Sequence, residues 1–241
     1  MRDPMFGSEF SRNLDRFAPQ DTNPYASSFG PVPDFDASKI DNDMVNSTGT
    51  TTIGLTTTDG VIIATDMRAS LGGRFVSNKD VQKVEQIHPR AALTLVGSVG
   101  GAQALIRALR AEANLYQSRR GEEMSMQALS TLAGHMCRGL PTTPILGGVD
   151  DEGHHVYSID PAGGVMKDDY TVTGSGLTVA YGTLERLYEP GLSNEEAIGV
   201  AAAGVKAAVE RDTGSGNGVY IAEITQEGVD IHGHKDFDEV L

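Results

Sequence analysis

The sequence predicts an α+β protein in which sheets lie between layers of helices. After residue 49, short β-rich runs alternate with pairs of longer amphipathic segments, in the order strands, two helices, strands, two helices, strands. Each amphipathic helix must bury an apolar face, and a sheet offers a surface on which two helices can do so. A change of composition at residue 50 separates this part from the preceding residues.

Strands are predicted where β-branched residues cluster, at 50–57, 61–65, 92–96, 144–148, 155–159, 170–172, 219–224 and 229–232. Helices are predicted where apolar residues recur every three or four positions, at 101–119, 124–138, 179–188 and 193–212. Thr58-Asp-Gly60 favours a hairpin turn between the first two strands. Ser193-Asn-Glu-Glu196 is a capping box that opens the last helix.

Residues 1–49 differ from the rest of the chain in amino-acid composition. They hold five of the ten prolines, eight acidic and four basic residues, and no persistent helical or strand period. Such a composition predicts an extended or disordered leader rather than part of the core.

The charge and cysteine content restrict the classes of partner and the compartment. Acidic residues outnumber basic ones by 33 to 19, a net charge of -14, which argues against nucleic acid and anionic membranes as partners. An acidic chain without tryptophan suits a salt-rich cytoplasm. A single cysteine, no signal peptide and no apolar run of membrane-spanning length indicate a cytoplasmic location.

Several common catalytic signatures are absent from the sequence. It contains no phosphate-binding P-loop, no Gly-x-Ser-x-Gly elbow, no His-Glu-x-x-His pair and no cysteine cluster, so we expect neither a metal nor an organic cofactor. His154-His155 follows a turn, and we expect it at the surface. Cys137 lies in an amphipathic helical segment, where a buried inert thiol is the expected state.

The candidate for chemistry is a hydroxyl, that of Thr50 in Gly49-Thr-Thr-Thr-Ile-Gly54. Threonine is common in strands, and that alone would explain the run. However, cleavage after Gly49 would free the α-amine of Thr50. An unperturbed α-amine has a pKa of about 7.7–8.0 and can accept a proton near neutral pH, so threonine would carry its own base. Gly49 would permit the bend that brings the Thr50 hydroxyl to the preceding carbonyl.

Seven short motifs in this order resemble proteasome β-subunits, most closely the archaeal type, over about residues 49–232. They are Gly49-Thr-Thr-Thr-Ile-Gly54, Ala64-Thr-Asp-Met-Arg-Ala-Ser70, Lys83-Val-Glu-Gln-Ile87, Val96-Gly-Ser-Val-Gly-Gly101, Ser158-Ile-Asp-Pro-Ala-Gly-Gly164, Thr173-Gly-Ser-Gly176 and Arg211-Asp-Thr-Gly-Ser-Gly216. The resemblance implies a four-layer αββα sandwich of the N-terminal-nucleophile hydrolase class, with two antiparallel sheets. It also implies that residues 1–49 are a propeptide removed autocatalytically and that residues 50–241 form the catalytic domain.

The resemblance assigns roles to individual residues. Thr50 is similar to the family's nucleophile, Lys83 to the lysine beside its hydroxyl, and Asp66 to the carboxylate that orients this lysine. Lys79 competes with Lys83, and we choose Lys83 because Val-Glu-Gln-Ile follows it. Arg68 lies close enough in sequence to pair with Asp66, but a structural role is expected for it.

Further assignments follow from the same resemblance. Gly97 is similar to the glycine whose N–H faces the oxyanion, although a tight turn would also explain it. Ser175, Asp212 and Ser215 are similar to the groups that hold the threonine amine and a catalytic water. Ala69, Leu95 and Val99 would line the substrate pocket, and their apolar character predicts cleavage after large apolar or aromatic residues.

The implied activity is threonine-type endopeptidase hydrolysis of unfolded proteins. The implied partners are other β-subunits in seven-membered rings, α-subunit rings and an AAA+ ATPase regulator. The alternatives are a non-catalytic assembly subunit of the same particle, a simpler bacterial-type threonine peptidase paired with an AAA+ unfoldase, and a small-molecule amidase. The presence of Thr50, Asp66 and Lys83 argues against a non-catalytic subunit.

Overall fold

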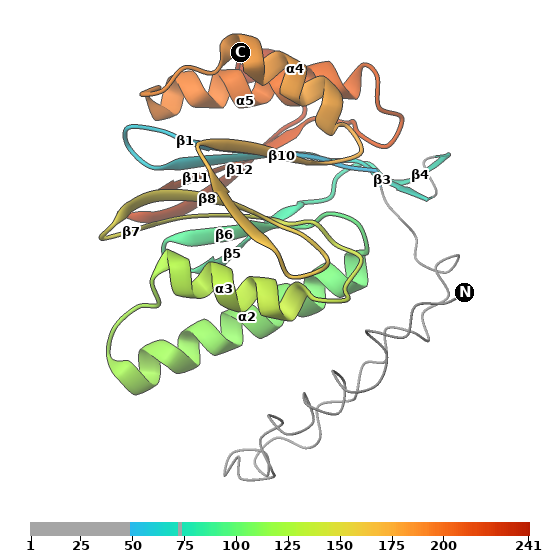
Figure 1. Ribbon diagram of the computed structural model, residues 1–241. Coiled ribbons are helices and arrows are strands. Elements are labelled where there is room, and N and C mark those ends of the chain that lie inside the picture. The colour runs from blue at the N-terminus through green and yellow to red at the C-terminus, as the bar shows by residue number, and fades with distance from the viewer. Residues whose placement is uncertain (1–48, 72–73) are drawn as a thin grey trace, which may run out of the picture. The chain divides into compact units, whose positions relative to one another are not determined.

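The computed structural model of the protein describes residues 49–71 and 74–241, so all of the expected leader, 1–49, except Gly49 lies outside the described residues. Two five-stranded antiparallel sheets lie face to face, and a pair of helices covers the outer face of each (Figure 1). The described residues therefore form the four-layer αββα sandwich that the resemblance implied.

The first sheet has the strand order β10-β1-β2-β11-β12. Its strands are β1 (Thr51–Thr56), β2 (Val61–Asp66), β10 (Tyr170–Gly174), β11 (Val219–Thr225) and β12 (Gly228–His234). β1 is an inner strand that pairs on both sides, so that Thr52 lies opposite Thr65 of β2 and Thr173 of β10. This register brings the start of the threonine run beside the ends of both neighbouring strands.

The second sheet has the strand order β5-β6-β7-β8-β9. Its strands are β5 (Val84–His88), β6 (Ala91–Thr94), β7 (Ile145–Asp150), β8 (Gly153–Ile159) and β9 (Val165–Asp168). A short hairpin of β3 (Ala69–Leu71) and β4 (Phe75–Asn78) follows β2 outside both sheets.

Among the described residues, three of the four α-helices begin at a serine side-chain cap. The four are α2 (Val99–Arg120), α3 (Met126–Cys137), α4 (Leu177–Leu187) and α5 (Asn194–Val209), followed by a short 3-10 turn, η3 (Phe237–Glu239). Ser193 and Glu196 form the predicted capping box of α5. The pair α2 and α3 covers the second sheet, and α4 and α5 cover the first (Figure 1).

The core has three apolar layers, one for each interface of the sandwich. Along β2, Val61 and Ile63 point between the two sheets, whereas Ile62 and Ala64 pack toward α4 and α5. Successive side chains of a strand point to opposite faces, so a strand covered on both sides is apolar throughout. This is why β2 reads as a continuous run instead of an alternating one.

The sequence prediction missed four short strands, which are β3, β4, β5 and β9. In β4 and β9 most side chains are exposed or only partly buried, so no apolar period marks them. α2 also begins at Val99, two residues before the predicted start, because Ser98 caps it by accepting a hydrogen bond from Gly101 N. Within the described residues, no helix is both long and apolar enough to cross a membrane.

Candidate active site

Thr50 lies at the entrance of β1, with its peptide bond to Gly49 intact. Its Oγ1 donates a hydrogen bond to the Gly49 carbonyl at 2.7 Å, and its backbone N–H donates to Ser175 Oγ at 3.0 Å. The residue is buried. The hydroxyl is therefore held against the peptide bond whose cleavage would free the amine of Thr50, which matches the bend expected at Gly49.

Lys83 and Asp66 form a buried ion pair beside this hydroxyl. Lys83 Nζ lies 2.8 Å from Asp66 Oδ1, 3.2 Å from Thr50 Oγ1 and 3.3 Å from the Gly49 carbonyl oxygen. Asp66 ends β2, and Lys83 immediately precedes β5, so the pair joins the two sheets. The structure thus brings Lys83 to Thr50, whereas Lys79 is exposed.

Burial governs the ionisation of this pair. Burial lowers the pKa of the Lys83 ammonium below its ordinary value, and the charge and hydrogen bond of Asp66 oppose that shift. Burial raises the pKa of the Asp66 carboxyl, opposed by Lys83 and by hydrogen bonds from the Thr51 and Gly216 N–H groups. Each group needs the other in order to stay charged, and together they place a cation beside the Thr50 hydroxyl.

A second set of polar groups meets Thr50 on its nitrogen side. Ser175 and Ser215 each donate a 2.6 Å hydrogen bond to Asp212 Oδ2, and Ser175 also accepts the Thr50 N–H. Ser175 is exposed and Asp212 is half-buried, whereas Ser215 is buried. Solvent therefore reaches the cluster at Ser175. The structure gathers all three residues that the resemblance assigned to the amine and water.

Gly97 occupies the turn between β6 and α2. Its φ is +87°, and a Cβ there would lie 2.3 Å from the Pro141 carbonyl oxygen, so no other residue fits. The neighbouring Ser98 N donates to that same carbonyl. The structural explanation for this glycine holds, and the role of its N–H toward an oxyanion stays a prediction.

The three residues expected to line the substrate pocket differ in exposure. Ala69 and Leu95 are buried, and Val99, the first residue of α2, is 41% exposed. Leu95 N donates a hydrogen bond to the Lys83 carbonyl oxygen at 2.7 Å, so the backbone of Leu95 lies directly beside that of Lys83. Val99 is therefore the accessible member of the three, and their role in binding substrate stays a prediction.

Several groups around Thr50 were not identified from the sequence. Ser70 Oγ accepts the Gly49 N–H at 3.1 Å. A Cβ on Gly49 would lie 2.2 Å from the Gly214 Cα, so the two glycines allow their backbones to touch. The only sequence signal for the contact at Gly214 was the Gly-Ser-Gly pattern at 214–216, which also occurs at 174–176. That pattern does not indicate which backbone segment Gly214 contacts.

Arg68 has a structural role, without a side-chain ion pair to Asp66. Its guanidinium donates to Asn217 Oδ1 at 3.0 Å and to the Thr213 carbonyl at 3.1 Å, while its backbone N–H donates to Asp66 Oδ2 at 2.9 Å. Arg68 thus holds the loop that carries Asp212 and Ser215.

The expectation that His154-His155 lies at the surface is wrong for His155. His155 is buried, and its Nε2 lies 2.8 Å from Asp150 Oδ1, because the strand begins at Gly153 and turns this ring inward. Cys137 is buried as expected, and burial raises the pKa of its thiol to about 11, which leaves it un-nucleophilic near neutral pH. In the described part of the chain, no group of three His, Cys, Asp or Glu residues is placed to hold a metal ion.

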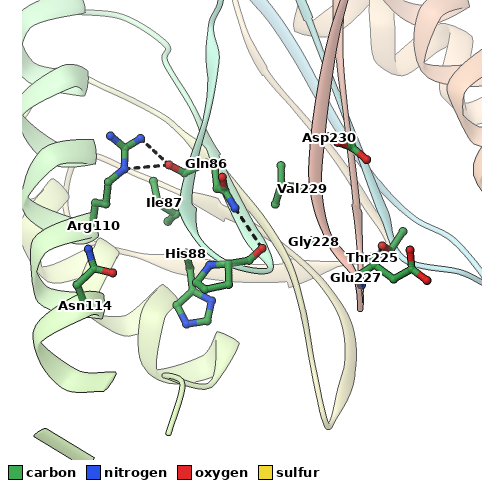
Figure 2. Close-up of a pocket in the computed structure, with 11 residues that line it drawn as sticks. Gln86, Ile87, His88, Arg110, Asn114, Thr225, Glu227, Gly228, Val229 and Asp230 are labelled. Carbon is green, nitrogen blue, oxygen red and sulfur yellow. Dashed lines mark hydrogen bonds between the residues drawn. The ribbon is translucent and has the colours of Figure 1, made fainter. Parts of the chain in front are cut away.

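A separate pocket of about 890 Å³ opens between α2, the end of β5 and the β11–β12 turn (Figure 2). Neither Thr50 nor any of the polar residues described around it lines this pocket. His88 lies in its wall, buried and with neither ring nitrogen hydrogen-bonded among the described residues. Burial lowers the pKa of His88 below its ordinary value, which favours the neutral ring. The Arg110 guanidinium donates a hydrogen bond to the Gln86 carbonyl oxygen at 3.1 Å.

Comparison with known proteins agrees with this geometry. A family model described as "Proteasome subunit" matches residues 46–224. Proteasome subunit beta 1 of Haloterrigena turkmenica is 69% identical over 244 residues, covering 100% of both chains. Proteasome subunit beta of Natronomonas pharaonis is 73% identical over 222 residues, covering 91% of this chain and 93% of that protein. Proteasome subunit beta 1 of Haloarcula marismortui is 68% identical over 246 residues, covering 100% of both.

The family match covers most of the chain, the relatives are haloarchaeal, and both agree with the sandwich fold and the acidic composition. The chain belongs to the proteasome subunit family and, within it, to the haloarchaeal β-subunits.

Proposed function

We propose that this chain is a catalytic β-subunit, a threonine-type endopeptidase that uses Thr50 as its N-terminal nucleophile after cleavage of Gly49–Thr50. The observation that carries the proposal is the position of the Thr50 hydroxyl, 2.7 Å from the Gly49 carbonyl oxygen and 3.2 Å from Lys83 Nζ. A non-catalytic subunit would have no need of a buried cation at this hydroxyl.

Self-cleavage would proceed by transfer of an acyl group from nitrogen to oxygen. Thr50 Oγ attacks the Gly49 carbonyl carbon, Lys83 donates to the carbonyl oxygen as negative charge develops, and the Thr50 nitrogen leaves with a proton. Water then hydrolyses the resulting ester. Residues 1–49 depart with a carboxylate, and Thr50 keeps its hydroxyl and gains a free amine.

Peptide hydrolysis would use the same groups in their processed state. The peptide nitrogen of Thr50 cannot act as a base, but the amine freed by cleavage can, through a water held near Ser175 and Asp212. Thr50 Oγ forms an acyl-enzyme with the substrate, the N–H of Gly97 is the proposed donor to the oxyanion, and water releases the second product. Lys83 favours the ionised hydroxyl by its charge.

The assembly and substrate are part of the proposal. We infer that the chain works in seven-membered β-rings beside α-subunit rings, in the cytoplasm, with an AAA+ regulator supplying unfolded proteins. The curated relatives are named proteasome β-subunits, which favours this assembly over the bacterial-type peptidase and the small-molecule amidase. The propeptide would keep the chain inactive, as a zymogen, until it assembles.

Intact mass tests the central claim. The wild-type chain, expressed with α-subunits, should lose residues 1–49, and a Thr50→Ala variant should keep them and show no peptidase activity. An active particle whose β-chains all retain Gly49 would rule the proposal out.

Fluorogenic peptides test the substrate preference. Peptides ending in Tyr or Leu should be cut faster than those ending in Glu or Arg, because Ala69, Leu95 and Val99 offer no charge. A Val99→Lys variant should lose cleavage after Leu and Tyr while keeping self-cleavage. The pocket assignment is wrong if acidic or basic peptides are preferred by the wild type.

A further inference from the structure

The residue after the proposed nucleophile lies in both polar groups of the site. Thr51 is fully buried, and its backbone N–H donates to Asp66 Oδ1 at 3.0 Å, the same oxygen that pairs with Lys83. Its hydroxyl lies 2.7 Å from Ser215 Oγ. Thr51 is thus bonded through its main chain to the Lys83 side of the site and through its side chain to the Asp212 side.

The direction of these hydrogen bonds follows from counting protons. A serine hydroxyl has one proton, and an ionised carboxylate only accepts. Ser215 and Ser175 both give their proton to Asp212 Oδ2 at 2.6 Å. Ser215 Oγ must therefore accept from Thr51, and Ser175 Oγ accepts from Thr50 N. Two chains of donors converge on Asp212, one from Thr51 and one from the nitrogen of Thr50.

The Thr51 hydroxyl lies against Gly176 as well as against Ser215. A Cβ on Gly176 would lie 2.0 Å from Thr51 Oγ1, so this glycine leaves the space that the hydroxyl fills. Gly176 N also donates to the Thr50 carbonyl at 3.3 Å. A side chain at position 176 would therefore displace the Thr51 hydroxyl from its hydrogen bond with Ser215.

We propose that Thr51 is a positioning residue, whose hydroxyl donates to Ser215 so that Ser215 and Asp212 hold Ser175 in place to receive the Thr50 amine. This role rests on the proposed function of Thr50. Removal of the Thr51 proton leaves Ser215 Oγ without a donor in a buried site, which weakens the bond that Ser215 makes to Asp212. Asp212 then attracts the ammonium form of Thr50 more strongly, and less of the amine is free to act as a base.

The test compares Thr51→Val with Thr52→Val. Each variant is expressed as the full-length chain with α-subunits, and the assembled particle is assayed after residues 1–49 have been removed. The two threonines are neighbours and equally buried, and each variant loses the hydrogen bonds of one hydroxyl. Thr52 Oγ1, however, bonds to the hydroxyl and the carbonyl of Thr173 in β10, outside the network. Thr51→Val should lower kcat roughly ten-fold, the effect of one hydrogen bond in a buried network, without raising KM. The acidic limb of its kcat profile should move to higher pH. Thr52→Val should leave kcat and the profile unchanged.

Rescue and processing complete the test. Thr51→Ser keeps the donor and should restore most of the lost kcat, and intact mass should show that all three variants lose residues 1–49. The inference is overturned if Thr51→Val behaves like Thr52→Val, if serine fails to rescue, or if Thr51→Val blocks processing. An active Thr50→Ala particle would instead reject the proposed function itself, so the two failures are distinguishable.

Discussion

Asp66 accepts hydrogen bonds from four groups, the Nζ of Lys83 and three backbone N–H groups. The backbone donors belong to Thr51, Arg68 and Gly216, which come from three different segments. A carboxylate with several donors can hold its charge in a buried site, and here it also sets the position of the ammonium that faces Thr50.

Asp66→Asn should therefore remove activity and destabilise the fold. Lys83 would be left buried without its counter-charge, a change that costs about 3–5 kcal/mol of unfolding free energy. Its pKa would fall further, so the unfolded chain would bind a proton that the folded chain lacks, and the stability of the variant should rise with pH. Urea unfolding of the unassembled chain across pH measures this.

The pair of Glu85 and Arg110 provides the control for that experiment. Its side chains are 34% and 44% exposed, so Glu85→Gln should change the unfolding free energy by less than about 1 kcal/mol. Equal losses for the two variants would contradict the importance given to burial at Asp66.

The contact between Gly49 and Gly214 predicts a requirement for glycine before the nucleophile. Gly49→Ala would bring a Cβ to 2.2 Å from the Gly214 Cα, and the backbone there cannot yield without moving the loop of Asp212 and Ser215. We expect self-cleavage to slow by roughly 100-fold or more, as for a displaced reacting group. The measurement is the fraction of uncleaved chain over time. Gly182→Ala in α4, where a Cβ meets nothing within 4 Å, should cleave at the wild-type rate.

Among the elements, α3 depends on an acidic residue from a different layer. Asp150 ends β7, and its Oδ2 accepts the N–H of Met126, the first residue of α3, at 2.7 Å. Its Oδ1 accepts from Glu152 N and pairs with His155 Nε2. Burial by itself would raise the pKa of Asp150, but these hydrogen bonds together lower it.

Asp150→Asn should cost about 2 kcal/mol of unfolding free energy near neutral pH, from the lost charge at the helix N-terminus and at His155. Because the folded-state pKa of Asp150 is lowered, its contribution is complete above the ordinary carboxyl pKa of about 3.9 and is lost as pH falls through the lower folded-state value. The difference between variant and wild type should accordingly shrink below about pH 4. Asp151→Asn, whose side chain is fully exposed, should match the wild type throughout.

For the whole molecule, the excess of 33 acidic over 19 basic residues predicts stabilisation by salt. Repulsion among surface carboxylates opposes folding, and it is screened over about 10 Å at 0.1 M salt but over about 3 Å at 1 M. Relief of about 2 kcal/mol would raise Tm by roughly 4–8 °C in a chain of this size. Thermal unfolding in 0.1 M and 2 M KCl measures the effect, and sucrose at equal osmolality is the control. A Tm independent of KCl would show that the charge is already balanced.

Much of the fold could be read from local patterns, because those patterns depend on neighbours in sequence. The capping box at Ser193 and Glu196 formed as predicted, and so did the hairpin over Thr58–Gly60. The polar strands β4 and β9 were missed because they are stabilised by pairing with a neighbouring strand and not by an apolar period of their own. The exposure of His155 was predicted wrongly because its burial depends on α3, a helix from another part of the chain that packs against β8.

The sequence by itself indicated that a strand begins at about residue 50 (Thr51 in the structure), that a glycine precedes Thr50, and that a threonine there could carry both nucleophile and base. Those are properties of residues adjacent in the chain. The tertiary structure decided which groups meet Thr50: it joins residues 125 positions apart at Ser175 and links Thr51 to Ser215, 164 positions away. Sheet order and register fix such contacts, and no local spacing encodes them. For that reason the second threonine of the run read as an ordinary strand residue, and only its hydroxyl contact indicated a role.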